Sequence, residues 1–208
     1  MADHELIGSK GCGSAIVEMA FDIAGIPCRV TDLPYLEPGA GRDRLLALNP
    51  LGQVPTLVLP DGTVLTESAA MILHAAESAP DCGLAPPPAS AARSRFLNEL
   101  IVLVAAVYPT FTFADDPGKF GLDGDAAVDF KAQADGRRLD IFRQIDARIT
   151  GPYWLGESLS ALDLYLVALT RWRPGRPWFE ANVPRVVAAA RAAERHPKVA
   201  AVVARHFD

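Results

Sequence analysis

The sequence predicts a mixed α/β domain with the element order βαβ-α-ββα, followed by an all-α helical bundle. Three observations predict this architecture. A strand, a helix and a second strand follow one another within residues 5–31. A strand pair joined by a tight turn then leads into a helix before residue 79. No convincing strand pattern follows Ser90, where long stretches with helical spacing of apolar residues take over.

The first three elements form a βαβ unit. Residues 5–8 are apolar enough for a short strand, and a glycine-rich loop follows them. Apolar residues then recur at helical spacing up to Gly25, which is suited to end a helix because glycine adopts the left-handed conformation easily. Residues 28–31 form the second strand. Because the connection between the strands is a helix, the two strands should be parallel.

The remaining elements of the α/β domain are a short helix and a hairpin. Residues 42–48 predict the helix, and residues 56–59 and 63–65 predict the two strands around an Asp61-Gly62 turn, a strong hairpin signal. A further helix begins at Thr66 or Glu67. This order is the thioredoxin-like topology.

A proline-rich stretch separates the two predicted domains. We assign residues 1–78 to the α/β domain, 79–89 to a semi-rigid linker and 90–208 to the helical domain. In the second domain Pro109 should kink or break a long helix over residues 93–113 near Ala105. Residues 115–124 form a loop and 126–149 a second long helix. Ser160 and Asp163 have the spacing of a capping box. A turn at 173–177 and helices at 184–195 and 197–206 complete the bundle.

Composition excludes several classes of partner and cofactor. The net charge is −5, from 20 basic and 25 acidic residues, and no basic run suggests nucleic-acid binding. No apolar stretch reaches the ~20 residues of a membrane span, and no signal segment opens the chain. Three cysteines without metal-ligand spacing argue against a disulfide framework and a zinc site. We therefore expect a cytoplasmic protein without a metal.

The most informative motif spans residues 49–68. Asn49-Pro50-Leu51-Gly52-Gln53-Val54-Pro55, followed by Thr66-Glu67-Ser68, resembles the glutathione site of the cytosolic glutathione transferases of the bacterial, serine or cysteine type. The segment from Gly156 to Asp163 resembles a capping segment in the helical domain of the same family.

The resemblance implies a role for each motif residue. Pro55 is expected to be cis, with the Val54 backbone pairing with the cysteinyl unit of glutathione. Glu67 and Ser68 would hold the γ-glutamyl amine and carboxylate, and Gln53 the glycyl carboxylate. Arg42, Arg44 and Lys10 are open candidates for a cation at that end.

The loop over residues 8–14 is where the thiolate should be stabilised. A free thiol titrates near ~8.5, so a donor at a helix N-terminus is needed to hold the anion at neutral pH. Cys12 is the favoured catalytic residue, Ser14 the alternative and Ser9 the third candidate. Backbone N–H groups at residues 11–14 are a further option. Counting back from Gly25 in register with serine-type members of the resembled family puts their usual catalytic position at Gly11, which has no side chain. Counting against its cysteine-type bacterial members puts theirs at Gly13, one residue past Cys12.

A second substrate should bind between the domains. The candidates for its pocket are aromatic side chains near Pro109 and in the turn after the Ser160 helix: Tyr108, Phe111, Phe113 and Trp172. Packing in the protein core is the alternative explanation for each of them taken singly. The resemblance implies a transferase of the detoxification type that conjugates glutathione, as co-substrate, to small electrophiles, with thiol-transferase or peroxidase side activity. It also implies a homodimer. The alternatives are a glutathione-dependent reductase, dehalogenase or isomerase using Cys12, and a non-catalytic binding or assembly protein.

Overall fold

A four-stranded mixed sheet forms the centre of the N-terminal domain. The computed structural model describes residues 3–208, so positions 1 and 2 of the predicted first domain lie outside the described residues. The strands lie in the order β2-β1-β3-β4. The bounds are β1 His4–Gly8, β2 Cys28–Asp32, β3 Thr56–Val58 and β4 Val64–Leu65. The pair β1–β2 is parallel, as predicted, whereas β1–β3 and β3–β4 are antiparallel.

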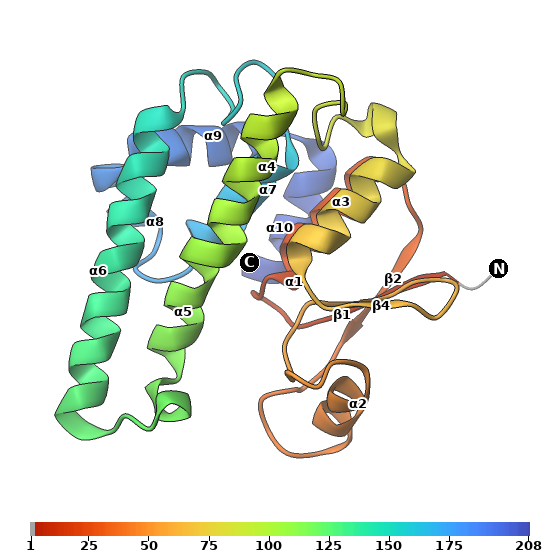
Figure 1. Ribbon diagram of the computed structural model, residues 1–208. Coiled ribbons are helices and arrows are strands. Elements are labelled where there is room, and N and C mark those ends of the chain that lie inside the picture. Colours follow the sequence, from red (N-terminus) through yellow and green to blue (C-terminus); the bar gives the residue numbers. More distant parts are fainter. Residues whose placement is uncertain (1–2) are drawn as a thin grey trace.

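Helices cover both faces of this sheet. Helices α1 (Ser14–Ala24) and α3 (Ser68–Ser78) lie together on one face, and α2 (Ala40–Leu48) lies on the other (Figure 1). The thioredoxin-like order is confirmed. The hairpin turn is one residue longer than predicted: the Leu59 N–H donates to the Thr63 carbonyl, so that the loop is Pro60-Asp61-Gly62.

The C-terminal domain is helical, with only an isolated bridge between Tyr153 and Gly156 outside the named strands. Its longer elements are α4 (Ala92–Val102), η2 (Leu103–Val107), α5 (Tyr108–Asp115), α6 (Gly124–Arg148), α7 (Ala161–Leu169), α8 (Arg176–Asn182), α9 (Pro184–Glu194) and α10 (Pro197–Phe207). Short 3₁₀ turns, η1 (Pro80–Cys82) and η3 (Pro117–Phe120), lie in predicted loops. Helix α8 was not predicted, because the sequence of residues 173–177 indicates only a turn. Pro177 is in fact compatible with its first turn.

The helix irregularity that Pro109 predicts near Ala105 is confirmed. Residues Leu103–Val107 form a π-helical turn between α4 and α5. Proline lacks the N–H and its ring clashes with the carbonyl four residues back, which here belongs to Ala105. The helix absorbs both effects by widening at that turn. Tyr108, immediately before the proline, is the first residue of α5.

The predicted capping box at α7 is confirmed. The backbone N–H and the hydroxyl of Ser160 both donate to Asp163 Oδ2, at 2.9 and 3.0 Å, and the Trp154 N–H donates to Asp163 Oδ1 at 2.8 Å. All three residues are buried. Ser160 and Asp163 therefore have the structural role expected of them.

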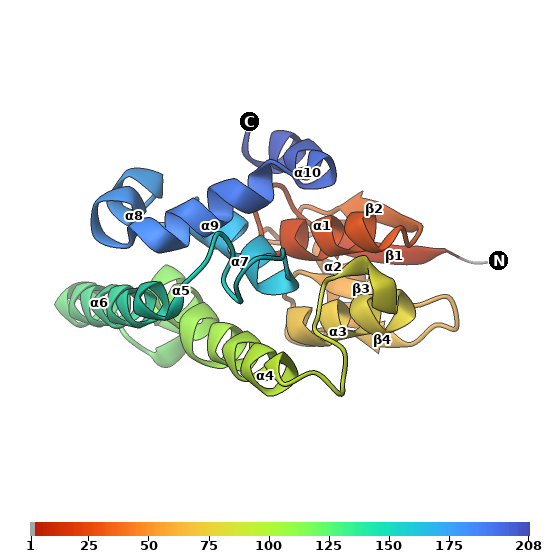
Figure 2. The same ribbon diagram turned by 90° about the horizontal axis from the view of Figure 1, so that it is seen from above.

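Two helices of the C-terminal domain, α7 and α10, pack on α1 (Figure 2). Helix α1 is thus buried between the sheet and the helical domain, with every residue from Ser14 to Phe21 buried. The continuous helical stretch Ala92–Asp115 is long enough to span a membrane, and an 18-residue window within it has a mean hydropathy of 1.6. Five of its apolar residues, Phe96, Leu100, Leu103, Val107 and Phe111, lie in the protein core, as expected for a core helix.

Candidate functional site

The segment before β3 presents an open backbone edge. The Val54-Pro55 peptide bond is cis, as expected. Asn49, which is buried, fixes this segment by donating from Nδ2 to the Gln53 carbonyl at 3.0 Å and to Thr56 Oγ1 at 3.1 Å. Among residues 3–208 the Val54 N–H and C=O have no hydrogen-bond partner. Val54 therefore keeps the pairing capacity that an extended peptide ligand requires.

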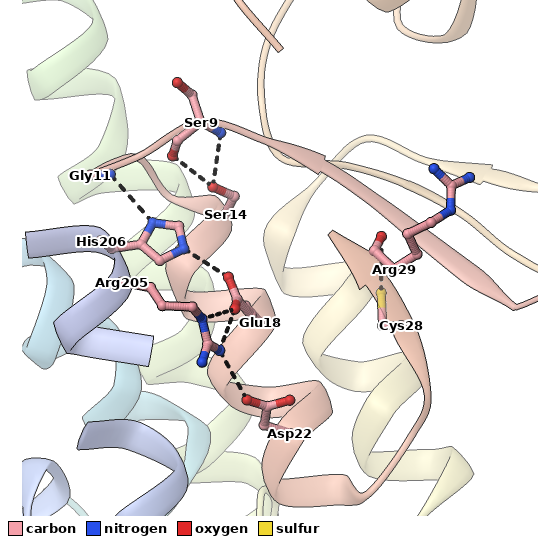
Figure 3. A network of polar contacts seen from close by, with 9 residues as sticks. All are labelled: Ser9, Gly11, Ser14, Glu18, Asp22, Cys28, Arg29, Arg205 and His206. Atoms are coloured by element: carbon pink, nitrogen blue, oxygen red, sulfur yellow. Dashed lines mark hydrogen bonds and ion pairs between the residues drawn. The ribbon is translucent and has the colours of Figure 1, made fainter. Parts of the chain in front are cut away.

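The loop between β1 and α1 brings the three catalytic candidates to the N-terminus of α1. Ser14 is already engaged within this loop: its hydroxyl donates to the Ser9 carbonyl at 3.1 Å and accepts from the Ser9 N–H at 3.2 Å (Figure 3). Gly11 has a φ of +75°, which favours glycine. The Ser14 side chain thus has a local structural role in the loop.

Cys12 lies in the same loop but in surroundings that favour the neutral thiol. Its Sγ lies 3.6 Å from the Tyr35 hydroxyl. Burial raises the pKa of the Cys12 thiol, and Asp32 adds to this increase, whereas the Tyr35 hydrogen bond only partly opposes it. A reactive cysteine needs a lowered pKa, so these surroundings do not activate the thiol.

Gly13 connects the loop to the open edge and to the helical domain. A Cβ atom placed on Gly13 would lie 3.0 Å from the Tyr108 hydroxyl oxygen and 3.5 Å from Pro55 Cδ. The N-terminus of α1, the cis proline and the start of α5 therefore meet at this residue. The backbone N–H groups of Gly13 and Ser14 have no hydrogen-bond partner in the described chain. They carry the positive end of the helix dipole.

The other half of the predicted site lies at the N-terminus of α3. Glu67 is the N-cap residue and is exposed, and its carboxylate makes no hydrogen bond within residues 3–208. Ser68 is buried and shares a hydrogen bond of 2.9 Å with the hydroxyl of Tyr165 on α7. The helical domain thus fixes a side chain of the predicted binding motif, a contact that the sequence analysis did not anticipate.

The predicted aromatic pocket residues separate into two groups. Trp172 packs edge-on against Tyr108 and Phe111, with ring centroids 5.5 and 5.1 Å apart. Phe113 instead joins a separate cluster with Phe120 and Phe130. Three of the four predicted residues therefore lie together at the domain junction.

Trp172 and His206 are both bonded to the loop backbone at Gly11. Trp172 Nε1 donates to the Gly11 carbonyl at 2.8 Å. Figure 3 shows the second contact, in which His206 Nδ1 accepts from the Gly11 N–H at 3.3 Å. His206 Nε2 lies 2.7 Å from Glu18 Oε2. The sequence offered one signal for His206: it continues the buried face of α10 after Val199, Val202 and Val203.

Of the three cations considered for the glycyl carboxylate, Arg42 lies nearest to the motif. A Cβ on Gly52 would be 3.9 Å from its guanidinium, and Arg42 also donates to the Tyr35 carbonyl at 2.9 Å. Arg44 pairs with Glu5 at 2.7 Å, and Lys10 is exposed. In the described residues no group of three or more His, Cys, Asp or Glu side chains is arranged to hold a metal ion.

A surface groove of about 540 Å³ lies elsewhere, in the helical domain. Pro184, Val187 and Arg191 of α9 are among the residues that line it, and none of the predicted site residues does.

Comparison with known proteins gives matches over the whole chain. The family model described as "Glutathione S-transferase, N-terminal domain" matches residues 14–78. Uncharacterized GST-like protein YncG of Escherichia coli K12 is 38% identical over 204 residues, covering 97% of this chain and 98% of that protein. A crystal structure of a glutathione transferase homolog from Sulfitobacter with bound glutathione is similar at a TM-score of 0.86 and 26% identity, with 97% of each chain covered. A sphingomonad glutathione S-transferase complexed with glutathione gives 0.79 and 26%, with 98% of this chain and 100% of that one covered.

Proposed function

Because this chain belongs to the cytosolic glutathione S-transferase superfamily, we propose that it binds glutathione and conjugates it to small electrophiles. The observation that carries the proposal is the meeting at Gly13 of the cis-Pro55 edge and the N-terminus of α1. A peptide strand paired with Val54 would place its cysteinyl sulfur beside that helix end, where a negative charge is favoured.

The two ends of the tripeptide have complementary groups. Glu67, exposed and without an internal partner in the described chain, suits the γ-glutamyl amine. Ser68 and the first N–H groups of α3 suit the γ-glutamyl carboxylate. At the glycyl end we assign Gln53 together with Arg42, since Arg42 is the cation placed next to Gly52.

The chemistry is a nucleophilic displacement or addition. The bound thiol loses its proton to solvent, and the thiolate attacks the electrophilic carbon of a substrate held at the domain junction. With an aryl halide, a carbon–sulfur bond forms and the carbon–halogen bond breaks, with halide leaving. The protein contributes by holding the thiolate and the electrophile close together. Tyr108, Phe111 and Trp172 supply an apolar wall for that substrate.

Disulfide chemistry at Cys12 receives less support. Thiol–disulfide exchange proceeds through a thiolate, and burial raises the pKa of Cys12. We therefore rank conjugation above the reductase and thiol-transferase alternatives.

The proposal also includes a cytoplasmic location and a homodimer, since members of this family are generally soluble and cytosolic. We place the dimer interface on α4, where the apolar side chain of Ile101 is 53% exposed.

Two measurements test the proposal: the affinity for glutathione by calorimetry, and the rate at which glutathione is conjugated to an activated aryl halide. The wild-type protein should bind glutathione, and Glu67→Ala should weaken binding by about 10- to 100-fold, the range expected for losing a charge-assisted hydrogen bond. The matched control is Glu77→Ala, because Glu77 is also exposed and lies near the other end of α3. It should bind like the wild type.

Three results separate this proposal from the alternatives. A folded wild-type protein that neither binds nor turns over glutathione would favour a binding or assembly role unrelated to the tripeptide. Binding without conjugation of any electrophile would favour a non-catalytic glutathione-binding protein. Loss of turnover in Cys12→Ala, with binding intact, would favour the cysteine-dependent alternatives.

A further inference from the structure

The hydroxyl of Tyr108 is a buried polar group without a partner. It is one of the few buried side-chain atoms that find no hydrogen-bond partner among the described residues. Burial, and next the neighbouring Tyr165 and Cys12, raise the pKa of Tyr108 well above its usual value, so the group stays a neutral O–H donor. Unsatisfied buried donors are rare and costly, and a catalytic role is one of the recognised reasons for keeping one.

This hydroxyl lies where the proposed function places the glutathione sulfur. The Tyr108 oxygen is 3.0 Å from the position a Cβ on Gly13 would take, and that position is 3.5 Å from Pro55 Cδ. A side chain at residue 13 would therefore crowd the hydroxyl, which would have to shift by a few tenths of an ångström. Because position 13 is glycine, the helical domain rather than the α/β domain supplies the polar side chain at this helix end.

We propose that the Tyr108 hydroxyl donates the hydrogen bond that holds the sulfur of bound glutathione as a thiolate. This inference rests on the proposed function and assigns the activating residue within it. Tyr108 is then a catalytic residue, contributed by α5 across the domain junction, and not only a wall of the electrophile pocket.

The other side chains near this helix end have different partners. Ser14 bonds to Ser9, and Cys12 lies against the Tyr35 hydroxyl. The Tyr108 ring is held edge-on by Trp172 and by Tyr165, with ring centroids 5.5 and 6.0 Å away. This packing aims the hydroxyl at Gly13 and limits its rotation. Since the hydroxyl is buried against Gly13, contact with a sulfur requires the Gly13 backbone to shift, while Gly11 keeps its bonds to Trp172 and His206.

The test is Tyr108→Phe, which removes only the oxygen. Calorimetry gives the glutathione affinity, and the ultraviolet absorbance of the thiolate, followed against pH, gives the pKa of the bound thiol. We expect Tyr108→Phe to bind glutathione within about threefold of wild type while the bound thiol pKa rises by about one to two units. Below that pKa, kcat/KM for conjugation should fall about 10- to 100-fold. S-methylglutathione, which has no thiol proton, should bind both proteins equally.

The matched control is Tyr153→Phe, which removes a tyrosine oxygen in the loop before α7 and should change none of these values. The Tyr108→Phe protein should melt no lower than wild type, because it loses a hydroxyl without a partner.

An unchanged thiol pKa in Tyr108→Phe would overturn the inference while leaving the proposed function standing. Loss of glutathione binding in a folded Tyr108→Phe protein would also overturn it, because the hydroxyl would then hold the tripeptide. Failure of wild type to bind glutathione would overturn both.

Discussion

His206, in the last turn of α10, accepts a hydrogen bond from the backbone N–H of Gly11, 195 residues earlier in the chain. The other nitrogen of the same ring contacts Glu18 on α1, and both side chains are buried. The last turn of α10 is thereby connected to the loop that precedes α1 and to the side of α1 itself (Figure 3). The conformation of the candidate thiol site thus depends on the end of the chain.

The first prediction concerns this contact. His206→Ala removes the acceptor for Gly11 and leaves the Glu18 carboxylate with Arg205 as its remaining partner. We expect the free energy of unfolding to fall by roughly 2–3 kcal/mol. We also expect faster amide hydrogen exchange at residues 11–13 and several-fold weaker glutathione binding. The control is Lys198→Ala, an exposed position on the same helix whose replacement should leave exchange in the loop unchanged. Unaltered exchange in His206→Ala would show that the loop does not depend on α10.

The second prediction is a pH dependence at Glu18. Burial raises the pKa of Glu18, but hydrogen bonds from His206 and Arg205 outweigh this effect and the net pKa is lowered. A carboxyl group with a lowered folded-state pKa stabilises the protein above its unfolded pKa near ~4.3, and this contribution disappears as the pH falls through the folded value. Glu18→Gln should therefore lose roughly 1.5–3 kcal/mol at pH 7 and progressively less below pH ~4. Urea unfolding at pH 7, 5, 4 and 3 measures this difference; an equal loss at every pH would refute it.

The third prediction tests the contact between Ser68 and Tyr165. Their shared hydrogen bond joins α3 to α7, and both residues are buried. Ser68→Ala and Tyr165→Phe should each cost about 1–3 kcal/mol of stability, because each leaves the partner hydroxyl unsatisfied. The double variant should cost less than the sum by about 0.5–1.5 kcal/mol.

Glutathione affinity separates the two roles. It should fall more in Ser68→Ala, which removes the group proposed to touch the ligand, than in Tyr165→Phe, which only removes its support. The reverse order would mean that Tyr165 is the contact residue.

The elements of the fold were predictable because their signals are local. Helical spacing from Ala15 to Ile23, the Gly25 terminator and the Ser160–Asp163 box each specify one element without reference to the rest of the chain. Pro109 likewise indicated where its helix becomes irregular. The helix α8 was missed because Pro174 and Pro177 suggested a turn, although a proline is compatible with a first helical turn.

The site was predictable only on the α/β side. The motif at residues 49–68 is continuous in sequence, so its edge and its helix start were recognisable. The residues that complete it come from far along the chain: Tyr165 bonds to Ser68, Trp172 to the Gly11 carbonyl and His206 to its N–H. No local pattern identifies such contacts, because they depend on how α7 and α10 pack against α1.

The fourth prediction concerns the reactivity of Cys12. Burial, opposed only in part by the Tyr35 hydroxyl, raises its pKa, so the thiolate fraction at pH 7 should be smaller than that of a free cysteine. Alkylation of Cys12 by iodoacetamide, followed by mass spectrometry of the peptide, should be at least several-fold slower than alkylation of free cysteine at pH 7. Its rate should still be rising at a pH where the rate of free cysteine has levelled off.

The comparison within this prediction is Tyr35→Phe, which removes the hydrogen bond that favours the thiolate. If burial sets the reactivity, Cys12 in this variant should be alkylated no faster than in wild type at the same pH. Both alkylation rates are first corrected for alkylation that occurs through unfolding. Alkylation of the folded wild-type protein faster than free cysteine at pH 7 would instead mark Cys12 as an activated nucleophile. That outcome would move the assignment towards the cysteine-dependent reductases and away from direct conjugation.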